Sequence, residues 1–131
     1  MEKALDFLKQ SGVFYLATAE EDQPRVRPFG AVCGFEGKLY LITANTKPVF
    51  AQLTKNPRAE ISSMTQDGRW IRITAELVPD GRREAKTAML DANPNLRGMY
   101  SEDDGKMEVL YLKDATAVIA SFTAAPETFR F

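Results

Sequence analysis

The stretch Lys38-Leu39-Tyr40-Leu41-Ile42-Thr43-Ala44-Asn45-Thr46-Lys47-Pro48-Val49-Phe50-Ala51-Gln52-Leu53 decides how the rest of the chain is interpreted. Its first half, up to Thr43, is apolar, aromatic and β-branched, which predicts a buried strand. In its second half apolar side chains recur at helical spacing after Pro48, a residue that suits a first helical turn. Asn45 or Thr46 is therefore the expected N-cap of a helix.

Lys47 conflicts with this helix start. The N-terminus of a helix carries a partial positive charge and favours acidic side chains, so a lysine there costs a few tenths of a kcal/mol unless an anion lies in front of it. Free backbone amides, a capping hydroxyl and a lysine at one helix start are suited to binding a phosphate group. A solvated lysine at a frayed helix end is the alternative, and this segment alone does not decide between them.

Composition places the chain among ordinary globular proteins. It has 131 residues, 44% of them hydrophobic and 27% charged, which predicts one folded domain over residues 1–131. Seventeen basic and eighteen acidic residues give no overall field for nucleic acid or an anionic membrane. No apolar run approaches the roughly 20 residues of a membrane helix, and the first residues do not begin a signal peptide. We therefore expect a cytoplasmic protein that binds neither nucleic acid nor membrane.

The absence of histidine excludes several kinds of site. The chain has no histidine and one cysteine, Cys33. It therefore has no Ser-His-Asp or Cys-His nucleophile, no histidine-ligated zinc or haem and no internal disulfide. Its acidic residues lack the spacing of a calcium-binding loop, so no metal site is expected. If the protein is an enzyme, a cofactor is expected to perform the chemistry.

The hydrophobic pattern predicts a mainly β protein with flanking helices. Period-two alternation is clearest over 70–78, and short turns join the segments before it. The expected helices cover 2–11, the segment from Pro48 to the Asn56-Pro57 breaker, and 82–92. The expected strands are 13–19, 24–33 and 38–43 in a meander, then 59–65, 70–78, 107–113, 116–122 and 127–131. Six or more antiparallel strands favour a small β-barrel without exposed edges, and apolar residues on both faces require helices or a second subunit to cover them.

Arg25 and Arg27 are the second group of interest. Residues two apart on a strand point to the same face, while Val26 points to the other. Like charges side by side repel unless an anion lies between them. A pair of exposed arginines, bonded to Glu20 or Glu21, is the alternative. Together with Lys47 one strand away, the anion interpretation becomes the stronger one.

These segments resemble a known family. Pro24-Arg25-Val26-Arg27-Pro28-Phe29, Leu39 to Lys47, Gln52-Leu53 and Asn56-Pro57 are similar to the pyridoxamine 5′-phosphate oxidase-like flavoproteins, the FMN-binding split β-barrels. The resemblance extends over nearly the whole chain and is closest to short members related to nitroimidazole-resistance proteins. It implies an antiparallel split β-barrel, a homodimer and two FMN sites at the subunit interface.

The resemblance also implies which residues bind the cofactor. One group lies along the flavin ring, a second holds the ribityl chain and phosphate, and Gln52 on the following helix contributes more weakly. Trp70 and Arg72 contact the flavin bound by the other subunit, although an indole such as Trp70 more often serves packing. The first group is Arg25, Val26, Arg27 and Pro28; the second is Thr43, Asn45, Thr46 and Lys47.

The sequence therefore favours an FMN-dependent oxidoreductase that transfers hydride or electrons from a reduced nicotinamide to a small acceptor. The chain stops at Phe131 and lacks histidine, which argues against vitamin B6 oxidation. Three alternatives stay open: a non-catalytic FMN carrier or sensor, an empty barrel that serves as a dimeric interaction module, and a deazaflavin in place of FMN.

Overall fold

The computed structural model describes all residues from 1 to 131. It contains three α-helices, one short 3-10 helix (η1) and eight strands. Their bounds, in chain order, are α1 Glu2–Ser11, β1 Phe14–Glu20, β2 Gln23–Phe29, β3 Val32–Phe35, β4 Lys38–Ala44, α2 Pro48–Lys55, β5 Arg58–Met64, β6 Trp70–Asp80, α3 Arg83–Ala92, η1 Pro94–Gly98, β7 Met107–Ala120 and β8 Glu127–Arg130.

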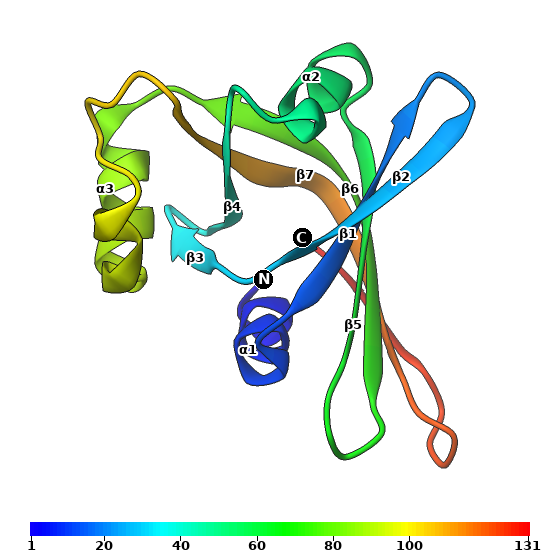
Figure 1. Ribbon diagram of the computed structural model, residues 1–131. Coiled ribbons are helices and arrows are strands. Elements are labelled where there is room, and N and C mark those ends of the chain that lie inside the picture. The colour runs from blue at the N-terminus through cyan, green and yellow to red at the C-terminus, as the bar shows by residue number, and fades with distance from the viewer.

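All strands belong to one antiparallel sheet in the order β2-β1-β5-β6-β7-β4-β3, with β8 also paired to β7. The long strand β7 divides the sheet, because its first half pairs with β4 and its second half with β8. The sheet curls around its core, with α1 below it, α2 above it and α3 against β3 and β4 (Figure 1). The expected antiparallel split β-barrel with flanking helices is thus confirmed.

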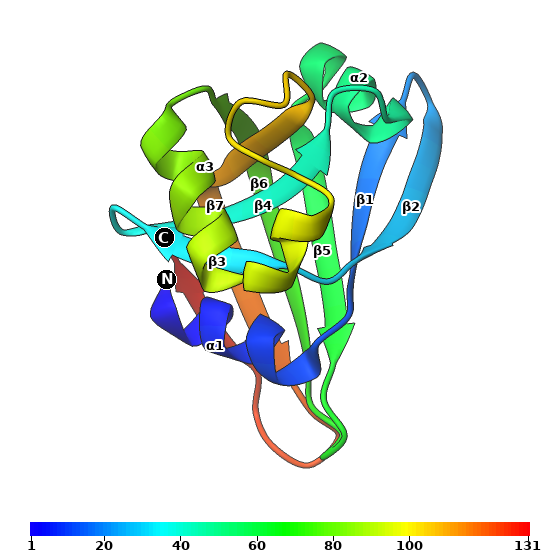
Figure 2. The same cartoon turned by 60° about the vertical axis from the view of Figure 1, so that its left-hand side comes forward.

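The apolar core has two parts. The larger, a cluster of 19 buried residues, fills the barrel between β1, β5, β6 and β7 and includes the apolar face of α1. The smaller, of eight residues, joins α3 to β3, β4 and the start of β7. Figure 2 shows α3 and η1 in front of this second part. No helix is long and apolar enough to cross a membrane.

Two of the strand predictions were wrong. The segment 24–33 is not one strand: β2 ends at Phe29, and β3 pairs with β4 at the opposite end of the sheet. Both halves of 24–33 contain apolar side chains, so the segment resembles one continuous strand. The local pattern does not show with which strand each half pairs. Conversely, 107–113 and 116–122 form one strand, β7, because Asp114 adopts a φ of 52° and the ladder continues through a bulge opposite Ala75.

A polar cluster fixes α3 to the β3–β4 hairpin. The Tyr40 hydroxyl donates to Asp80 Oδ2 at 2.7 Å, and Arg82 Nη2 donates to Asp80 Oδ2 at 2.9 Å and to Glu36 Oε1 at 2.6 Å. Tyr40 is fully buried. Burial of the phenol, reinforced by the Asp80 carboxylate, raises the pKa of Tyr40 to about 12, and hydrogen bonding from Arg82 holds the pKa of Asp80 well below its usual range.

Tyr40→Phe tests this cluster. Because the native pKa of Tyr40 is raised from 10 to about 12, the unfolded chain releases this proton first as the pH rises. Its contribution to stability is therefore complete below pH 10 and is lost between pH 10 and about 12. In urea unfolding, the variant should be less stable than the wild-type protein by about 1.5 kcal/mol at neutral pH. Between pH 10 and about 12 it should lose less stability than the wild-type protein does. Equal alkaline slopes in both proteins would contradict the assignment.

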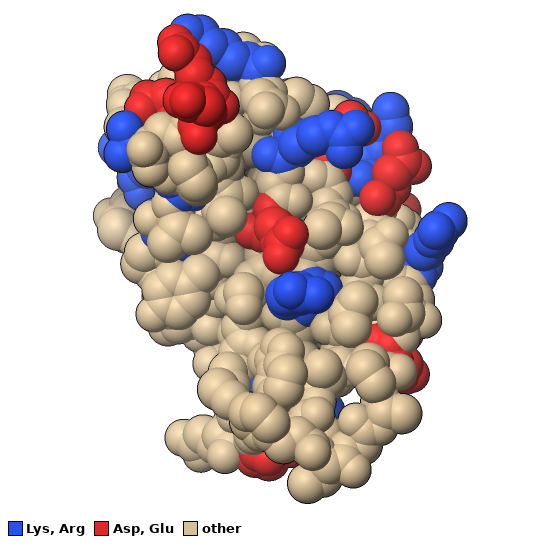
Figure 3. All heavy atoms as spheres, turned by 90° about the vertical axis from the view of Figure 1, so that its right-hand side faces the viewer, with Lys and Arg blue, Asp and Glu red and all other residues tan.

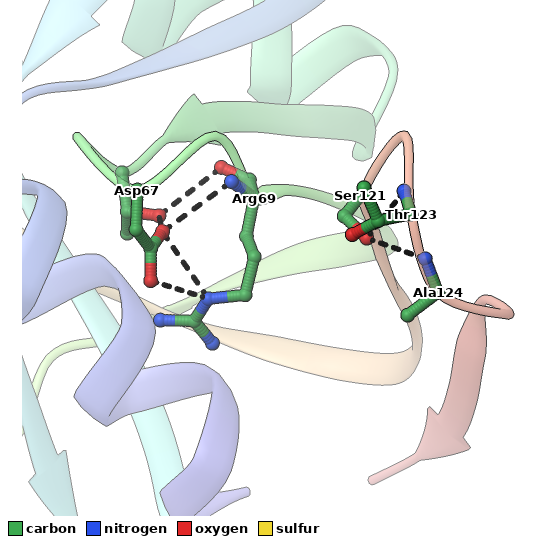
Figure 4. Close-up of polar contacts among 6 residues, drawn as sticks. Asp67, Arg69, Ser121, Thr123 and Ala124 are labelled. Atoms are coloured by element: carbon green, nitrogen blue, oxygen red, sulfur yellow. Dashed lines mark hydrogen bonds and ion pairs between the residues drawn. The ribbon is translucent and has the colours of Figure 1, made fainter.

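Two hairpin tips extend below the barrel, and local hydrogen bonds shape both (Figure 4). In the β5–β6 turn, Asp67 accepts hydrogen bonds from the backbone and guanidinium of Arg69 and from Thr65. In the β7–β8 loop, Ser121 Oγ accepts from the amides of Thr123 and Ala124. These contacts fix the backbone beside Trp70 and Phe122, whose ring centroids are 5.1 Å apart.

Candidate functional site

A cavity of about 360 Å³ opens where β2, the end of β4, the start of α2 and η1 meet. Strand β4 carries the chain to this point and α2 begins there, so the junction predicted from residues 38–53 forms one wall. The lining residues are Arg27, Pro28, Phe29, Gly30, Ala31, Ile42, Thr43, Lys47, Val49, Asn93, Asn95, Leu96, Met99 and Tyr100. A volume of this size falls in the range of small-molecule sites.

Three acceptors within 3.1 Å of its guanidinium hold Arg27 in place. Its Nη1 donates to the Leu16 carbonyl at 3.1 Å and to Thr18 Oγ1 at 2.8 Å, and its Nη2 donates to Gln52 Oε1 at 2.7 Å. Thr18 Oγ1 in turn donates to Gln52 Oε1 at 2.6 Å. Burial lowers the pKa of Arg27, but a guanidinium stays charged at neutral pH. No carboxylate neutralises it, so the cavity has one positioned cation with no counter-ion.

Lys47 supplies the second cation at the start of α2. The structure corrects the predicted cap: Lys47 itself occupies the N-cap position in an extended conformation, and Pro48 follows at the first helical position. Asn45 and Thr46 are not the N-cap, because the chain needs these exposed residues to turn from β4 into the helix. The helix has neither a side-chain cap nor an acidic residue in its first turn. Its positive end is thus left without a negative partner.

Thr43 is the residue of the cavity wall whose side chain is incompletely hydrogen-bonded. Its side chain is 3% exposed and lines the cavity. Its hydroxyl is the single buried side-chain polar atom without a hydrogen-bond partner. Such an atom costs about 1–3 kcal/mol when left unpaired, and a side-chain rotation that turns the hydroxyl into the cavity would let a polar ligand group pair with it. Arg27, Lys47 and Thr43 therefore form a cavity wall suited to a polar anion.

The other predicted residues lie outside the cavity lining. Arg25 pairs with Glu20 on the surface, at 2.8 Å, as the alternative interpretation expected. Asn45 Nδ2 donates to the Gly105 carbonyl at 3.0 Å, and Thr46 is exposed. Gln52 is buried behind Arg27. Of the predicted phosphate and flavin residues, the structure brings together Arg27, Pro28, Thr43 and Lys47.

Val26, Trp70 and Arg72 lie on a different surface, which we call the outer face: the solvent side of β1, β2, β5 and β6. Val26 pairs with Ala17 there, and Met64 pairs with Trp70. Tyr15, Val26 and Met64 are 49%, 67% and 56% exposed. Figure 3 shows this side of the molecule: charged side chains gather in its upper part, and the lower part is almost uncharged. Within one chain, neither Trp70 nor Arg72 lines the cavity.

Comparison with known proteins identifies the family. A model of the family described as pyridoxamine 5′-phosphate oxidase matches residues 1–113. The chain belongs to the pyridoxamine 5′-phosphate oxidase family. A NimC/NimA family protein from Clostridium acetobutylicum is 54% identical, with a TM-score of 0.98 over 100% of this chain and 92% of that one. No functionally curated protein matches the chain.

More distant structures share the fold of this family. General stress protein 26 from Bacillus anthracis is 17% identical, with a TM-score of 0.76 over 99% of this chain and 97% of that one. An F420 reductase is 19% identical, with a TM-score of 0.61 over 82% of this chain and 90% of that one. At these identities the likeness concerns the fold alone.

Sequence reasoning missed two groups of residues in this family member. Thr18, on the neighbouring strand β1, accepts a hydrogen bond from Arg27. Thr18 lies close to Arg27 only because the β1–β2 ladder pairs Thr18 with Arg25. Asn95, Met99 and Tyr100 come from the segment that follows the predicted 82–92 helix, and nothing local to it indicates that it covers the cavity. No group of three or more acidic or cysteine side chains could hold a metal ion.

Thr18→Val tests whether Thr18 positions Arg27. The substitution keeps the shape of the side chain but removes one acceptor from Arg27 and one donor to Gln52. A neutral hydrogen bond contributes about 0.5–1.5 kcal/mol, so a ligand whose phosphate meets Arg27 should bind roughly 3- to 10-fold more weakly. The same ligand without its phosphate should bind as before, and Thr18→Ser should restore the affinity for the phosphorylated one. Equal losses for both ligands would indicate a purely structural role.

Proposed function

We propose that this chain is a cytoplasmic FMN-dependent oxidoreductase whose residues 1–131 form a single domain and whose working form is a homodimer. The observation that carries the proposal is the convergence of Arg27, Lys47 and Thr43, whose buried hydroxyl has no partner, on the lining of one cavity. A monoester phosphate is a suitable ligand for two cations without counter-ions at a helix start. The ribityl hydroxyls of FMN offer partners of the kind that Thr43 lacks. The family membership supports a flavin as the group attached to that phosphate.

The protein side chains are expected to bind and orient the flavin, while the flavin supplies the redox chemistry. Apart from Arg27 and Lys47, Tyr100 is the one ionisable residue in the cavity lining. No carboxylate or thiol reaches the cavity to serve as a general base, and Cys33 is buried with its pKa raised to about 11 by that burial. We therefore propose that a reduced nicotinamide delivers hydride to the bound flavin and that a small acceptor receives the electrons.

The outer face supports the homodimer. Exposed apolar side chains gathered on one surface mark interaction sites, and here they include Tyr15, Val26 and Met64. Pro28 is exposed and lines the cavity at the end of β2, where its ladder partner is Tyr15. A second copy on the outer face would therefore cover the cavity edge as well. Trp70 and Arg72 would reach the flavin of that second copy.

An absorption spectrum of the purified protein, with mass spectrometry of the molecule released on denaturation, tests the cofactor. We expect the two visible bands of an oxidised flavin and the mass of FMN. If the released molecule has the mass of a deazaflavin, that cofactor replaces FMN in the proposal. This outcome is worth testing because one structural neighbour is an F420 reductase. A colourless protein that takes up no added FMN would overturn it.

A non-catalytic FMN carrier or sensor is the second candidate, and one observation favours it: the cavity lining has no carboxylate or thiol that a dedicated reaction would use as a general base. Steady-state oxidation of NADH and NADPH with a panel of small acceptors separates the two candidates. Turnover well above that of the same concentration of free FMN supports the oxidoreductase. Oxidation no faster than with free FMN supports the carrier.

A further inference from the structure

Asn93 lies at the junction of α3 and η1, and its side chain lines the cavity. Figure 2 shows this junction in front of β3. The side-chain Nδ2 of Asn93 donates to the carbonyls of Val32 and Met89, both at 3.1 Å. A carboxamide has two N–H donors, so both are used within the protein. These two contacts fix the amide against β3 and the last turn of α3.

The backbone of Asn93 is paired as well. Its amide donates to the Met89 carbonyl at 3.1 Å, and its carbonyl accepts from the Leu96 amide at 2.9 Å. Asparagine is a preferred N-cap residue, and Asn93 occupies the N-cap position of η1, yet its oxygen makes no cap hydrogen bond there. Oδ1 is therefore the one polar atom of this residue that has no partner.

This oxygen is accessible. Asn93 is half-buried, and Thr43 Oγ1 is the single buried side-chain polar atom that lacks a partner, so protein atoms do not enclose Asn93 Oδ1. Because the nitrogen is turned toward Val32 and Met89, the oxygen is the group that Asn93 offers to a ligand. A carboxamide oxygen accepts hydrogen bonds and cannot donate them. A ligand that pairs with it must supply an N–H or O–H group.

Asn93 meets the cavity at a distance from the start of α2. Its anchor Val32 pairs with Leu41 in the β3–β4 ladder, whereas the Lys47 amide donates to the Ala44 carbonyl at 3.0 Å, at the end of β4. Leu41 lies three residues before Ala44, which is about 10 Å along a strand. A ligand whose phosphate lies at Lys47 would therefore meet Asn93 with a part remote from that phosphate.

We infer that Asn93 is a ligand-binding residue of the cavity, whose fixed carboxamide oxygen accepts a hydrogen bond from an N–H or O–H group remote from the ligand's phosphate. The inference rests on the proposed function and deepens it. FMN has two kinds of such donor, the ribityl hydroxyls and the imide N3–H of the ring. A structural role in joining α3 to β3 accounts for the nitrogen of this side chain and leaves the oxygen unexplained.

Binding of FMN analogues to the apoprotein, measured by fluorescence titration, tests the inference. 3-Methyl-FMN lacks the imide donor, and the 2′-, 3′- and 4′-deoxy analogues each lack one ribityl hydroxyl. The analogue without the donor that pairs with Asn93 should bind the wild-type protein roughly 3- to 10-fold more weakly than FMN. In Asn93→Leu that penalty should shrink by the same factor, because the pair is already broken. Loss of the two structural hydrogen bonds affects all ligands alike and cancels in this comparison.

Asn95→Leu is the matched control. It makes the same chemical change in the same cavity lining, at an exposed side chain without a hydrogen bond to the protein. The penalty for every analogue should stay within about twofold of its wild-type value. If the penalties stay unchanged in Asn93→Leu as well, or shrink in Asn95→Leu instead, the Asn93 oxygen is not the acceptor and the inference fails.

NMR of the wild-type protein gives a readout that no substitution affects. The ¹³Cγ resonance of Asn93 should shift when FMN binds, and the shift should be clearly smaller with the one analogue that lacks the paired donor. An equal response to FMN and to all analogues would overturn the inference. Failure to bind FMN would refute the proposed function itself, whereas FMN binding with unchanged penalties would refute this inference alone.

Discussion

Arg27→Met is expected to weaken FMN binding by roughly 10- to 150-fold. The guanidinium is the one cation of the cavity that three protein acceptors hold in place, and a charge-assisted contact to phosphate contributes about 1.5–3 kcal/mol. The substitution keeps an unbranched apolar stem but also leaves the Thr18 and Gln52 side chains with fewer partners. The loss should therefore lie at the upper end of this range.

Arg25→Met provides the matched control, on the same strand, two residues away and facing the same way. Because Arg25 pairs with Glu20 on the surface and does not line the cavity, we expect its removal to change the FMN dissociation constant less than about threefold. Fluorescence titration of the apoprotein measures both variants. Equal losses at the two positions would mean that general charge, and not the positioned cation, attracts the phosphate.

Met64→Asp is expected to convert the proposed homodimer to a monomer. Met64 is 56% exposed beside Tyr15 and Trp70, on a surface with an apolar pocket between β1, β5 and β6. A second copy packed there would bury the new carboxylate without a partner, which costs several kcal/mol. The dimer dissociation constant should rise more than about 100-fold, and FMN affinity should fall with it if the partner completes each site.

Sedimentation velocity at micromolar concentration measures the assembly state directly. Gln10→Asp introduces the same charge on exposed α1 and should leave the dimer intact. A wild-type protein that sediments as a monomer would contradict the homodimer. A Met64→Asp protein that remains dimeric would move the interface away from the outer face.

Local pattern predicted the strands and helices of this fold well where one face is buried. The bounds of α1 agree with the expected 2–11, and β6 shows the alternation expected over 70–78, with Ile71 and Ile73 fully buried. The errors arose where pairing depends on distant segments. Nothing within 24–33 indicates that β3 leaves β2 to pair with β4, and a single residue, Asp114, allows β7 to continue where two separate strands were expected.

The candidate site could be predicted only in part for the same reason. Arg27 and Lys47 were identified because their charges conflict with their local surroundings, and that conflict is visible in the sequence. Thr18 has no such signal: a threonine on an apolar strand is ordinary until the ladder places it beside Arg27. Met99 and Tyr100 likewise contribute through the placement of η1, which follows from the packing of α3 against β3 and β4.

The account depends most on the claim that the cavity binds the phosphate group of FMN through Arg27 and Lys47. Comparing the dissociation constants of FMN and riboflavin tests this claim, since the two ligands differ only in that phosphate. The wild-type apoprotein should prefer FMN at least about 100-fold, and Lys47→Ala should reduce the preference roughly 10-fold or more without weakening riboflavin binding. Equal affinity of the wild-type protein for the two ligands would contradict the account.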